Sequence, residues 1–274
     1  MIDFQQLFRQ WLAPKLAEIA PRKPEEIDEL ADALYEQWLS SPSEALDGLS
    51  PRAYYQQWND AQLYQEVLNY LDAEMPFPDP LCDELTARAS VFGPLMVRLL
   101  TKPMCGHQLQ MVLDRLVEMQ YAPMLEDCLL LACQSDEQAA DAAERAADAM
   151  TNFGQAAGRL ALQALAEQQD PAVVDRLADI VASTLPGAQA YPAILALFEQ
   201  RRDARAFYAR ALAKLGEEAA IEPLTAALRA EDLTYYDYLA LRDAVEELGG
   251  FVEIERIFDG DADYQRLQDW GDEQ

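Results

Sequence analysis

Two copies of a helical unit follow each other directly between Asp203 and Gly249. RDARAFYARALAKLG is followed by EEAAIEPLTAALRAED, and LTYYDYLALRDAVEELG then begins the first half again. Related positions recur upstream, with aspartates at 136, 170, 203 and 232 and glycines at 154, 187, 216 and 249. A period of about 30 residues predicts stacked helix pairs, because each pair is too small to bury its own apolar face.

The recurring residues have the chemistry of helix ends. A short carboxylate ahead of an alanine-rich run accepts hydrogen bonds from first-turn amides, which predicts helix starts at Asp136, Asp170 and Asp203. Glycine adopts a left-handed C-terminal cap without a side-chain clash, which predicts helix stops at Gly154, Gly216 and Gly249.

Prolines recur near the start of each predicted second helix, at Pro123, Pro192 and Pro223. A proline costs little there, because first-turn amides lack partners within the helix. In the last unit Ile221, Leu224 and Leu228 are three and four residues apart, so they predict the apolar stripe that faces the core.

The pattern ARALAKLGEEAAIEPLTAAL, with a partial copy in LRDAVEELG, resembles the short HEAT-like repeat of many bacterial proteins, including phycobilin lyase subunits. The resemblance is clear over 203–250, degenerate over about 101–202 and absent from about the first 80 residues. It implies an α-solenoid of antiparallel helix pairs, the armadillo-type superhelix. Its families include scaffolds, chromophore-lyase subunits, a metal-dependent hydroxylase and DNA glycosylases, so the resemblance points to a fold more than to a function.

Composition narrows the class of protein. Apolar residues make up 51% and charged residues 26%, which is typical of a folded chain. The 21 Lys and Arg against 49 Asp and Glu give a formal charge of −28, which argues against nucleic-acid binding because that affinity comes largely from basic residues. The DNA glycosylase branch of the resemblance is therefore disfavoured.

The expected compartment is the cytoplasm. Four cysteines, at 82, 105, 128 and 133, are too few for a disulfide framework and favour reduced thiols. The N-terminus interrupts its apolar residues with Asp, Gln and Arg, unlike a secretory signal. The longest apolar run, 190–198, contains a proline and is far shorter than the roughly 20 residues of a membrane span, so no membrane partner is expected.

The predicted organisation has three parts: an irregular helical N-terminal cap over 1–80, a HEAT-like array over 81–258, and an acidic tail over 259–274. Three prolines between Met75 and Pro80 mark the expected junction. No segment alternates like a half-buried strand, so the fold class is all-α. The first helix is predicted from an amphipathic face, Phe4, Leu7, Phe8, Trp11 and Leu12, and is expected to kink or restart at Pro14. Further helices are predicted at 24–39, about 60–73, 81–91, 94–101, 104–119, 122–134, 136–152, 155–168, 171–184, 190–200, 203–215, 217–230, 234–248 and 251–258.

Catalytic and metal sites are not expected. The single histidine, His107, lies near Cys105, but no Cys-x-x-Cys pair accompanies it, so packing is favoured over zinc. Asp259, Asp261 and Asp263 begin like a calcium loop, yet Tyr264 replaces its glycine. Without a second histidine the iron site of the HEAT-repeat hydroxylases cannot form, and no phosphate loop or nucleophile elbow occurs.

Two local features have competing interpretations. A basic cluster, Arg201, Arg202, Arg205, Arg210 and Lys214, is interpreted as salt bridges to acids of adjacent repeats. Two groups of aromatic residues either contact a partner protein or belong to the hydrophobic core. They are Tyr54, Tyr55 and Trp58, and Tyr235, Tyr236 and Tyr238.

The leading hypothesis is a non-enzymatic scaffold that binds a protein or peptide with a basic surface on the concave face of the superhelix, without cofactor. Polar and aromatic positions on the second helices, off the apolar stripe, are the predicted binding residues: Glu126, Arg159, Gln163, Tyr191, Glu222 and Arg229. The alternative is an enzyme subunit similar to the chromophore lyases, holding a small molecule in the groove.

Overall fold

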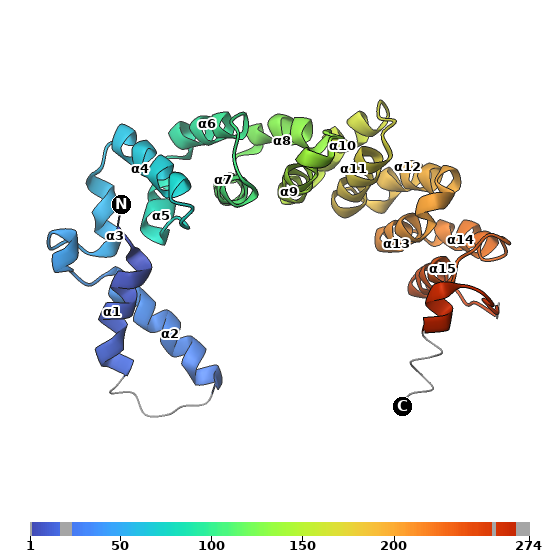
Figure 1. Ribbon diagram of the computed structural model, residues 1–274, viewed down its shortest axis with the longest axis horizontal. Coiled ribbons are helices and arrows are strands. Elements are labelled where there is room, and N and C mark those ends of the chain that lie inside the picture. Colours follow the sequence, from blue (N-terminus) through green and yellow to red (C-terminus); the bar gives the residue numbers. More distant parts are fainter. Residues whose placement is uncertain (1, 17–23, 254–255, 267–274) are drawn as a thin grey trace. The chain divides into compact units, whose positions relative to one another are not determined.

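Helices are the only regular secondary structure in the part of the chain that the structure describes. The computed structural model describes residues 2–16, 24–253 and 256–266, of which 75% are helical and none lies in a strand. The chain divides into two compact units, residues 1–127 and 128–274 (Figure 1). The all-α prediction is confirmed.

The first unit contains seven helices and the start of an eighth among its described residues: α1 (Phe4–Leu16), α2 (Pro24–Leu39), α3 (Pro51–Tyr54), α4 (Asp60–Asp72), α5 (Asp79–Ala87), α6 (Ala89–Leu100), α7 (Gly106–Glu118) and α8 (Leu125–Ala132). Residues 75–78, in the predicted junction, are not helical. α5, which follows them, packs against α3, which precedes them, so both lie within this unit. The division at residue 80 stays a prediction.

The second unit continues with α9 (Ala140–Thr151), α10 (Gln155–Leu165), α11 (Pro171–Thr184), α12 (Gly187–Gln200), α13 (Arg205–Leu215), α14 (Ile221–Ala227) and α15 (Tyr235–Glu247). Single 3-10 turns precede four helices of the chain, at Ala122–Met124, Glu137–Ala139, Arg202–Ala204 and Glu218–Ala220. Most predicted helices are therefore present, with ends displaced by a few residues.

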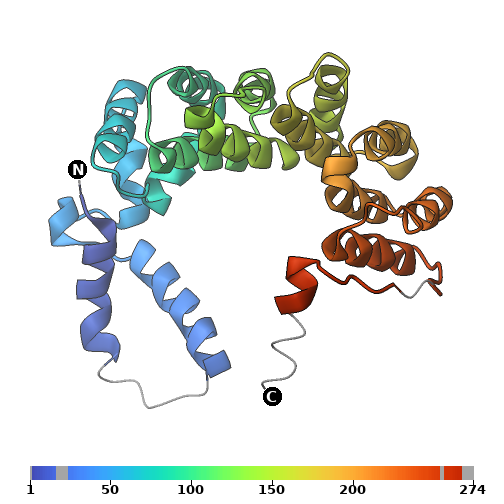
Figure 2. The ribbon, with the colours of Figure 1, turned by 45° about the vertical axis from the view of Figure 1, so that its right-hand side comes forward.

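The helices of the second unit pair in a different frame from the predicted one. The most extensive contacts join α10 to α11, α13 to α15 and α12 to α13, and α14 packs on α15, whereas the predicted partners α13 and α14 touch little. α9, α11, α13 and α15 also contact one another in succession, as the two views in Figures 1 and 2 allow the reader to follow. The sequence period is the same for either pairing, so periodicity alone could not choose between them.

The predicted helix starts are right at two of three aspartates. Asp170 accepts from the amides of Ala172 and Val173 at 3.0 and 3.2 Å, and Asp136 accepts from Gln138 at 2.9 Å. Asp203 is not a cap: it lies inside a 3-10 turn and accepts from Arg201 at 2.8 Å. The guanidinium of Arg201, two residues before it, offers a stronger, charge-assisted bond than a first-turn amide does.

The glycine and proline predictions hold in part. Gly216 ends α13 in the left-handed conformation, with φ of 70°, and Gly249 follows α15 with φ of 86°. Gly187 has another role: it opens α12, and a Cβ there would meet the carbonyl oxygen of Leu215 at 2.7 Å. Pro192 is the sixth residue of α12, beyond the first turn where it was predicted, because this helix begins three residues early.

The predicted helix over 251–258 is wrong for its described residues. Residues 251–253 and 256–258 are not helical, and 254–255 lie outside the described part. Phe258 instead packs against Tyr235 and Tyr238, and the guanidinium of Arg256 donates to the carbonyls of Ala230 and Glu231. These tertiary contacts outweigh a weak local helix preference. In the predicted tail, residues 262–266 are helical, and 267–274 lie outside the described residues.

The two units are packed with different side chains. The largest fully buried residues of the first unit include Tyr55, Tyr70 and Phe92, while the second unit buries many alanines along its helices. Small side chains let helices approach closely, whereas large rings need irregular surroundings. None of the described helices is long and apolar enough to cross a membrane.

Candidate functional site

An aromatic pocket of about 390 Å³ lies in the first unit. It is built by α1, by the end of α2 and by the residues that precede α5. Rings make up much of its wall: Phe4, Phe8, Tyr35, Trp38, Tyr70 and Phe77. Pockets of this volume, apolar with a few polar groups, are typical of ligand sites.

Hydrogen bonds hold the tyrosines of this aromatic pocket. Tyr35 Oη donates to Asp79 Oδ2 at 2.7 Å, which ties α2 to α5. Tyr70 Oη donates to the carbonyl of Ile2 at 2.5 Å, which fixes the start of α1. Burial, the largest cause, raises the pKa of Tyr70 to about 12, so this hydroxyl stays protonated. The phenols are structural donors.

A wider groove adjoins the aromatic pocket and shares Tyr35, Phe77 and Asp79 with it. We call it the acidic groove, defined by these residues together with Glu36, Leu39, Arg52, Cys82, Asp83, Thr86, Ala87, Arg115 and Glu118. Four carboxylates and two guanidiniums line it. Cys82 is buried there, and desolvation raises the pKa of its thiol to about 12, so it is no nucleophile.

The charges of the acidic groove are unevenly matched. Arg52 pairs with Glu36 at 2.7 Å and Arg115 pairs with Glu118 at 2.5 Å. Asp83 has no hydrogen bond or ion pair among the described residues, and partial burial followed by the charge of Asp79 raises its pKa. Arg115 is only 7% exposed, and its buried Nε–H has no acceptor in the chain.

The N-terminal aromatic group is core. Tyr55 is completely buried and packs against Phe4, Tyr54 and Trp58, with ring centroids 5.6, 5.0 and 5.1 Å away. The C-terminal group is divided, because Tyr235 and Tyr238 pack against Phe258 while Tyr236 is 52% exposed. Packing therefore explains most of these aromatic residues.

The six predicted binding residues do not gather around the acidic groove. Five are exposed, and Tyr191 is half-buried and donates to the carbonyl of Ala219 at 3.0 Å. They are distributed over α8, α10, α12, α14 and the residues after α14: Glu126, Arg159, Gln163, Tyr191, Glu222 and Arg229. Their role in binding stays a prediction. The groove residues of α5 have the spacing of one helix face, but nothing in the sequence indicates that this face meets residues of α2 and α7.

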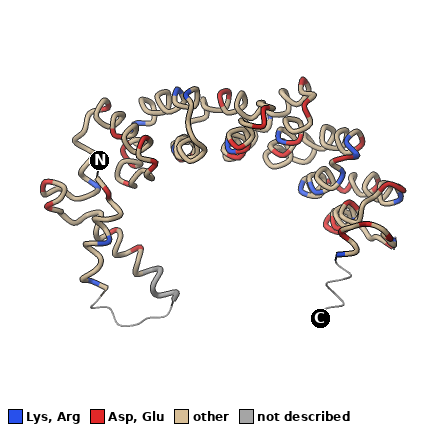
Figure 3. The backbone as a smooth tube through the Cα atoms, viewed as in Figure 1, with Lys and Arg blue, Asp and Glu red and all other residues tan. Residues whose placement is uncertain are grey.

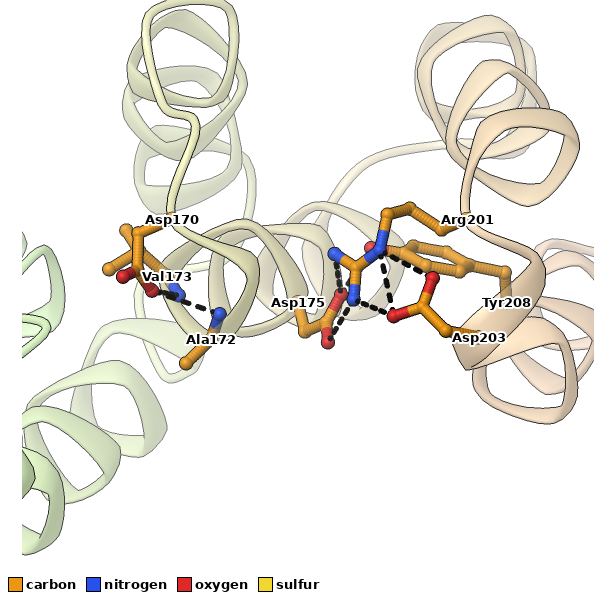
Figure 4. Close-up of polar contacts among 7 residues, drawn as sticks. All are labelled: Asp170, Ala172, Val173, Asp175, Arg201, Asp203 and Tyr208. Atoms are coloured by element: carbon orange, nitrogen blue, oxygen red, sulfur yellow. Dashed lines mark hydrogen bonds and ion pairs between the residues drawn. The ribbon is translucent and has the colours of Figure 1, made fainter.

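The salt-bridge interpretation of the basic cluster is confirmed for Arg201 and Arg205, whereas Arg210 and Lys214 donate to neutral hydroxyls. Arg201 bridges Asp175 of α11 and Asp203, at 3.1 and 2.8 Å, and Tyr208 Oη of α13 donates to the same Asp175 at 2.5 Å (Figure 4). Other members reach neighbouring segments: Arg205 pairs with Asp232 in the turn before α15, Arg210 donates to Tyr236 of α15, and Lys214 donates to Ser183 of α11.

The described residues contain no group of three or more His, Cys, Asp or Glu side chains placed to hold a metal ion. No disulfide joins the four cysteines, all of which lie in the described part of the chain. In the segment that begins like a calcium loop, the carboxylate of Asp261 accepts from the amides of Tyr235, Asp263 and Tyr264 at 3.0 to 3.1 Å. That carboxylate caps a helix and anchors α15.

An all-helical protein of two units with an aromatic pocket and an acidic groove is thus the class that fold and site define. No family model matches the chain, and no curated protein matches it either.

Proposed function

We propose that this protein is a non-enzymatic interaction scaffold, built of HEAT-like helix pairs, that binds a basic segment of a partner protein. The observation that carries the proposal is that many arginines form ion pairs with carboxylates of the same chain. Among the described residues these arginines form ion pairs within the chain: Arg52, Arg88, Arg115, Arg145, Arg176, Arg201, Arg205, Arg242 and Arg266.

Internal pairing of the cations leaves the acidic surplus on the surface. Exposed carboxylates without an ion pair in the described part of the chain include Glu126, Asp179, Glu222 and Glu246, and Figure 3 shows Asp and Glu on helices of both units. Exposed charge of one sign attracts a partner of the opposite sign and repels like-charged molecules. A basic protein segment fits this surface, and a nucleic acid does not.

The HEAT-like solenoid is part of the same proposal. Its support is the succession of contacts from α9 through α11 and α13 to α15, together with polar ties between those helices. Arg176 of α11 donates to Glu144 of α9, and Arg210 of α13 donates to Tyr236 of α15. Such nearest-neighbour ties are what a stacked array requires.

A random peptide library displayed on phage, selected against the immobilised full chain, tests the function. We expect the enriched peptides to carry net positive charge and to bind more weakly as salt rises, because exposed ion pairs are screened. Charge reversal of Glu126 and Glu222 to Lys should slow association at low salt if the predicted face takes part. Enrichment of neutral or acidic peptides, or binding that ignores salt, would contradict the proposal.

The alternative function, a subunit similar to the chromophore lyases, has one observation in its favour. The aromatic pocket is large enough for a small organic molecule, with ring faces for stacking. The full chain purified under native conditions would then carry a ligand with its own absorbance. Mass spectrometry of the native protein distinguishes the two functions, because the scaffold retains only the mass of its chain.

A further inference from the structure

We propose that the acidic groove and the aromatic pocket of the first unit together dock one basic, apolar-anchored peptide segment of the partner. A Lys or Arg of the segment pairs with Asp79 and Asp83, a neighbouring apolar side chain enters the aromatic pocket, and a backbone carbonyl accepts from Arg115. This inference rests on the proposed function and names the place and the chemistry of binding.

The carboxylates of α5 supply the charge. Asp79 and Asp83 are four residues apart and therefore lie on the same face of the helix. Glu36 and Glu118 are already paired, but Asp83 is exposed and has no hydrogen bond or ion pair among the described residues, and Arg52 and Arg115 act on it only through their charge. Asp79 accepts one hydrogen bond from Tyr35, and an ionised carboxylate has about four acceptor sites, so Asp79 can accept further hydrogen bonds. The two acids offer an incoming cation a site that no described cation of the chain occupies.

Arg115 on α7 is an independent second observation. Its side chain is more than nine-tenths buried, lines the acidic groove, and leaves Nε–H without an acceptor. Buried donors in native proteins nearly always have a partner, and the described chain supplies none for this Nε–H. Because the atom is enclosed by protein, a ligand carbonyl reaches it only once the Arg115 side chain turns toward the groove. A peptide carbonyl supplies an acceptor without a charge. A free anion is disfavoured, since Asp79, Asp83, Glu36 and Glu118 surround the site.

The aromatic pocket supplies the apolar anchor. Phe8, Tyr35 and Trp38 present rings whose centroids are 5.0 to 5.4 Å apart, and all three line the pocket. Its volume of about 390 Å³ has room for a leucine or phenylalanine side chain. Because the pocket and the groove share Tyr35, Phe77 and Asp79, the basic and apolar residues of the segment must be close in its sequence. An aliphatic stem that carries a positive charge is also attracted to the ring faces.

The test uses an array of fluorescein-labelled decapeptides that contain two or three Lys or Arg and one or two Leu, Phe or Trp in all relative positions. Each is titrated by fluorescence polarisation against the full chain. We expect binders in which a basic and an apolar residue lie within a few positions of each other. Replacing the apolar residue of a binder by Ser should weaken binding about tenfold, and replacing its basic residues by Ser should do the same.

Variants of the protein locate the binding. Asp83→Lys should weaken binding about tenfold or more, while the matched reversal Asp72→Lys, on an exposed residue of the same unit outside the groove, should change it less than about twofold. Phe8→Ala should weaken only the peptides with an apolar anchor. Asp83→Asn, which keeps the shape of the side chain, should fold at least as stably and bind about threefold or more weakly. Melting curves confirm that each variant is folded.

Three outcomes would overturn the docking site, and they are distinguishable. If Asp83→Lys and Asp72→Lys weaken binding equally, net charge alone attracts the peptides and the groove is not the site. If only the reversals of Glu126 and Glu222 weaken binding, the proposed function stands and the binding residues lie outside the acidic groove. If no peptide of the array binds, while the phage selection also fails to enrich basic peptides, the groove and the proposed function both fail.

Discussion

Arg115 in the first unit and Arg176 in the second are each 7% exposed, yet their surroundings differ. Arg176 donates to Glu144 at 2.8 Å and to the carbonyls of Ala132 and Gln134 at 2.7 and 3.3 Å. Arg115 pairs with Glu118 through one terminal nitrogen and leaves Nε–H without a partner. Arg176 therefore joins α11 to the end of α8 and to α9, while Arg115 has one hydrogen-bond donor without an acceptor beside the acidic groove.

The difference extends to the packing of each unit. The second unit buries alanines between its helices, and polar side chains tie α9 to α11, α11 to α13 and α13 to α15. The first unit packs rings around an irregular chain, and both the aromatic pocket and the acidic groove lie there. Regular close packing favours a stable support. Irregular packing of large side chains leaves space in which a ligand can bind, so we place docking in the first unit.

The largest expected effect comes from removing a ring from the core of the first unit, and it tests whether the two units unfold independently. Phe92 is completely buried in α6, and Phe92→Ala should lower the free energy of unfolding by about 3 to 5 kcal/mol because it leaves a cavity. Hydrogen exchange followed by mass spectrometry should show lost protection mainly in residues 51–118. Val91→Ala, at a residue that is 40% exposed, is the control and should have little effect. Equal loss of protection over 140–247 would show that the two units unfold together.

The two buried arginines give the next largest contrast. Arg176→Met should cost about 2 to 4 kcal/mol, because the carbonyls of Ala132 and Gln134 lose their donor inside the protein. Arg115→Met should cost less than about 1 kcal/mol, since the partner that it releases, Glu118, is 57% exposed and is hydrated instead. Urea unfolding of both variants measures the difference. Equal costs would mean that Arg115 is as much a structural residue as Arg176.

Aspartate caps provide a smaller test within the second unit. Asp170→Ala should cost about 1 kcal/mol through loss of the N-cap of α11, whereas Asp170→Asn should retain most of it. Asp203→Ala should cost less, since an exposed ion pair contributes little. The side-chain bond from Arg201 lowers the pKa of Asp203, so its contribution is present above the ordinary pKa of about 3.9 and is lost as the pH falls below it. Thermal unfolding of these variants at pH 7 and pH 3 measures the stability costs and their dependence on pH. A greater loss of stability at pH 3 than at pH 7 for Asp203→Ala would contradict the predicted pH dependence.

The smallest expected effect is a gain of stability in the acidic groove. The pKa of Asp83 is raised in the folded protein, so protonation favours the folded state and stability falls as the pH rises from about 3.9 through the folded pKa. Asp83→Asn removes the unfavourable charge and should raise the melting temperature at pH 7, with a smaller gain at acidic pH. Asp72→Asn, outside the groove, should not show this dependence. A lower melting temperature for Asp83→Asn at pH 7 would indicate that the charged carboxylate has a favourable partner.

Local features of the fold could be read from the sequence because their causes lie within a few residues. Asp170 followed by Pro171 predicted the start of α11, and Gly216 predicted the end of α13, since capping depends on neighbouring amides and on backbone conformation. The spacing of Ile221, Leu224 and Leu228 identified the inward stripe: Leu224 and Leu228 are completely buried and Ile221 is half-buried. Asp203 has the same local signature as Asp170, and only the position of Arg201 decided that it pairs instead of capping.

The sequence by itself determined an all-helical chain, the period of its second half and a strong acidic surplus, because propensity, spacing and charge are local or additive properties. Tertiary structure alone decided that α12 packs on α13, since a period does not specify which neighbour a helix contacts. It also decided the acidic groove, which joins residues of α2, α5 and α7 that lie far apart in the chain. Whether a carboxylate pairs with a cation, or a buried Nε–H has an acceptor, depends on distances between side chains that only the packing of the helices determines.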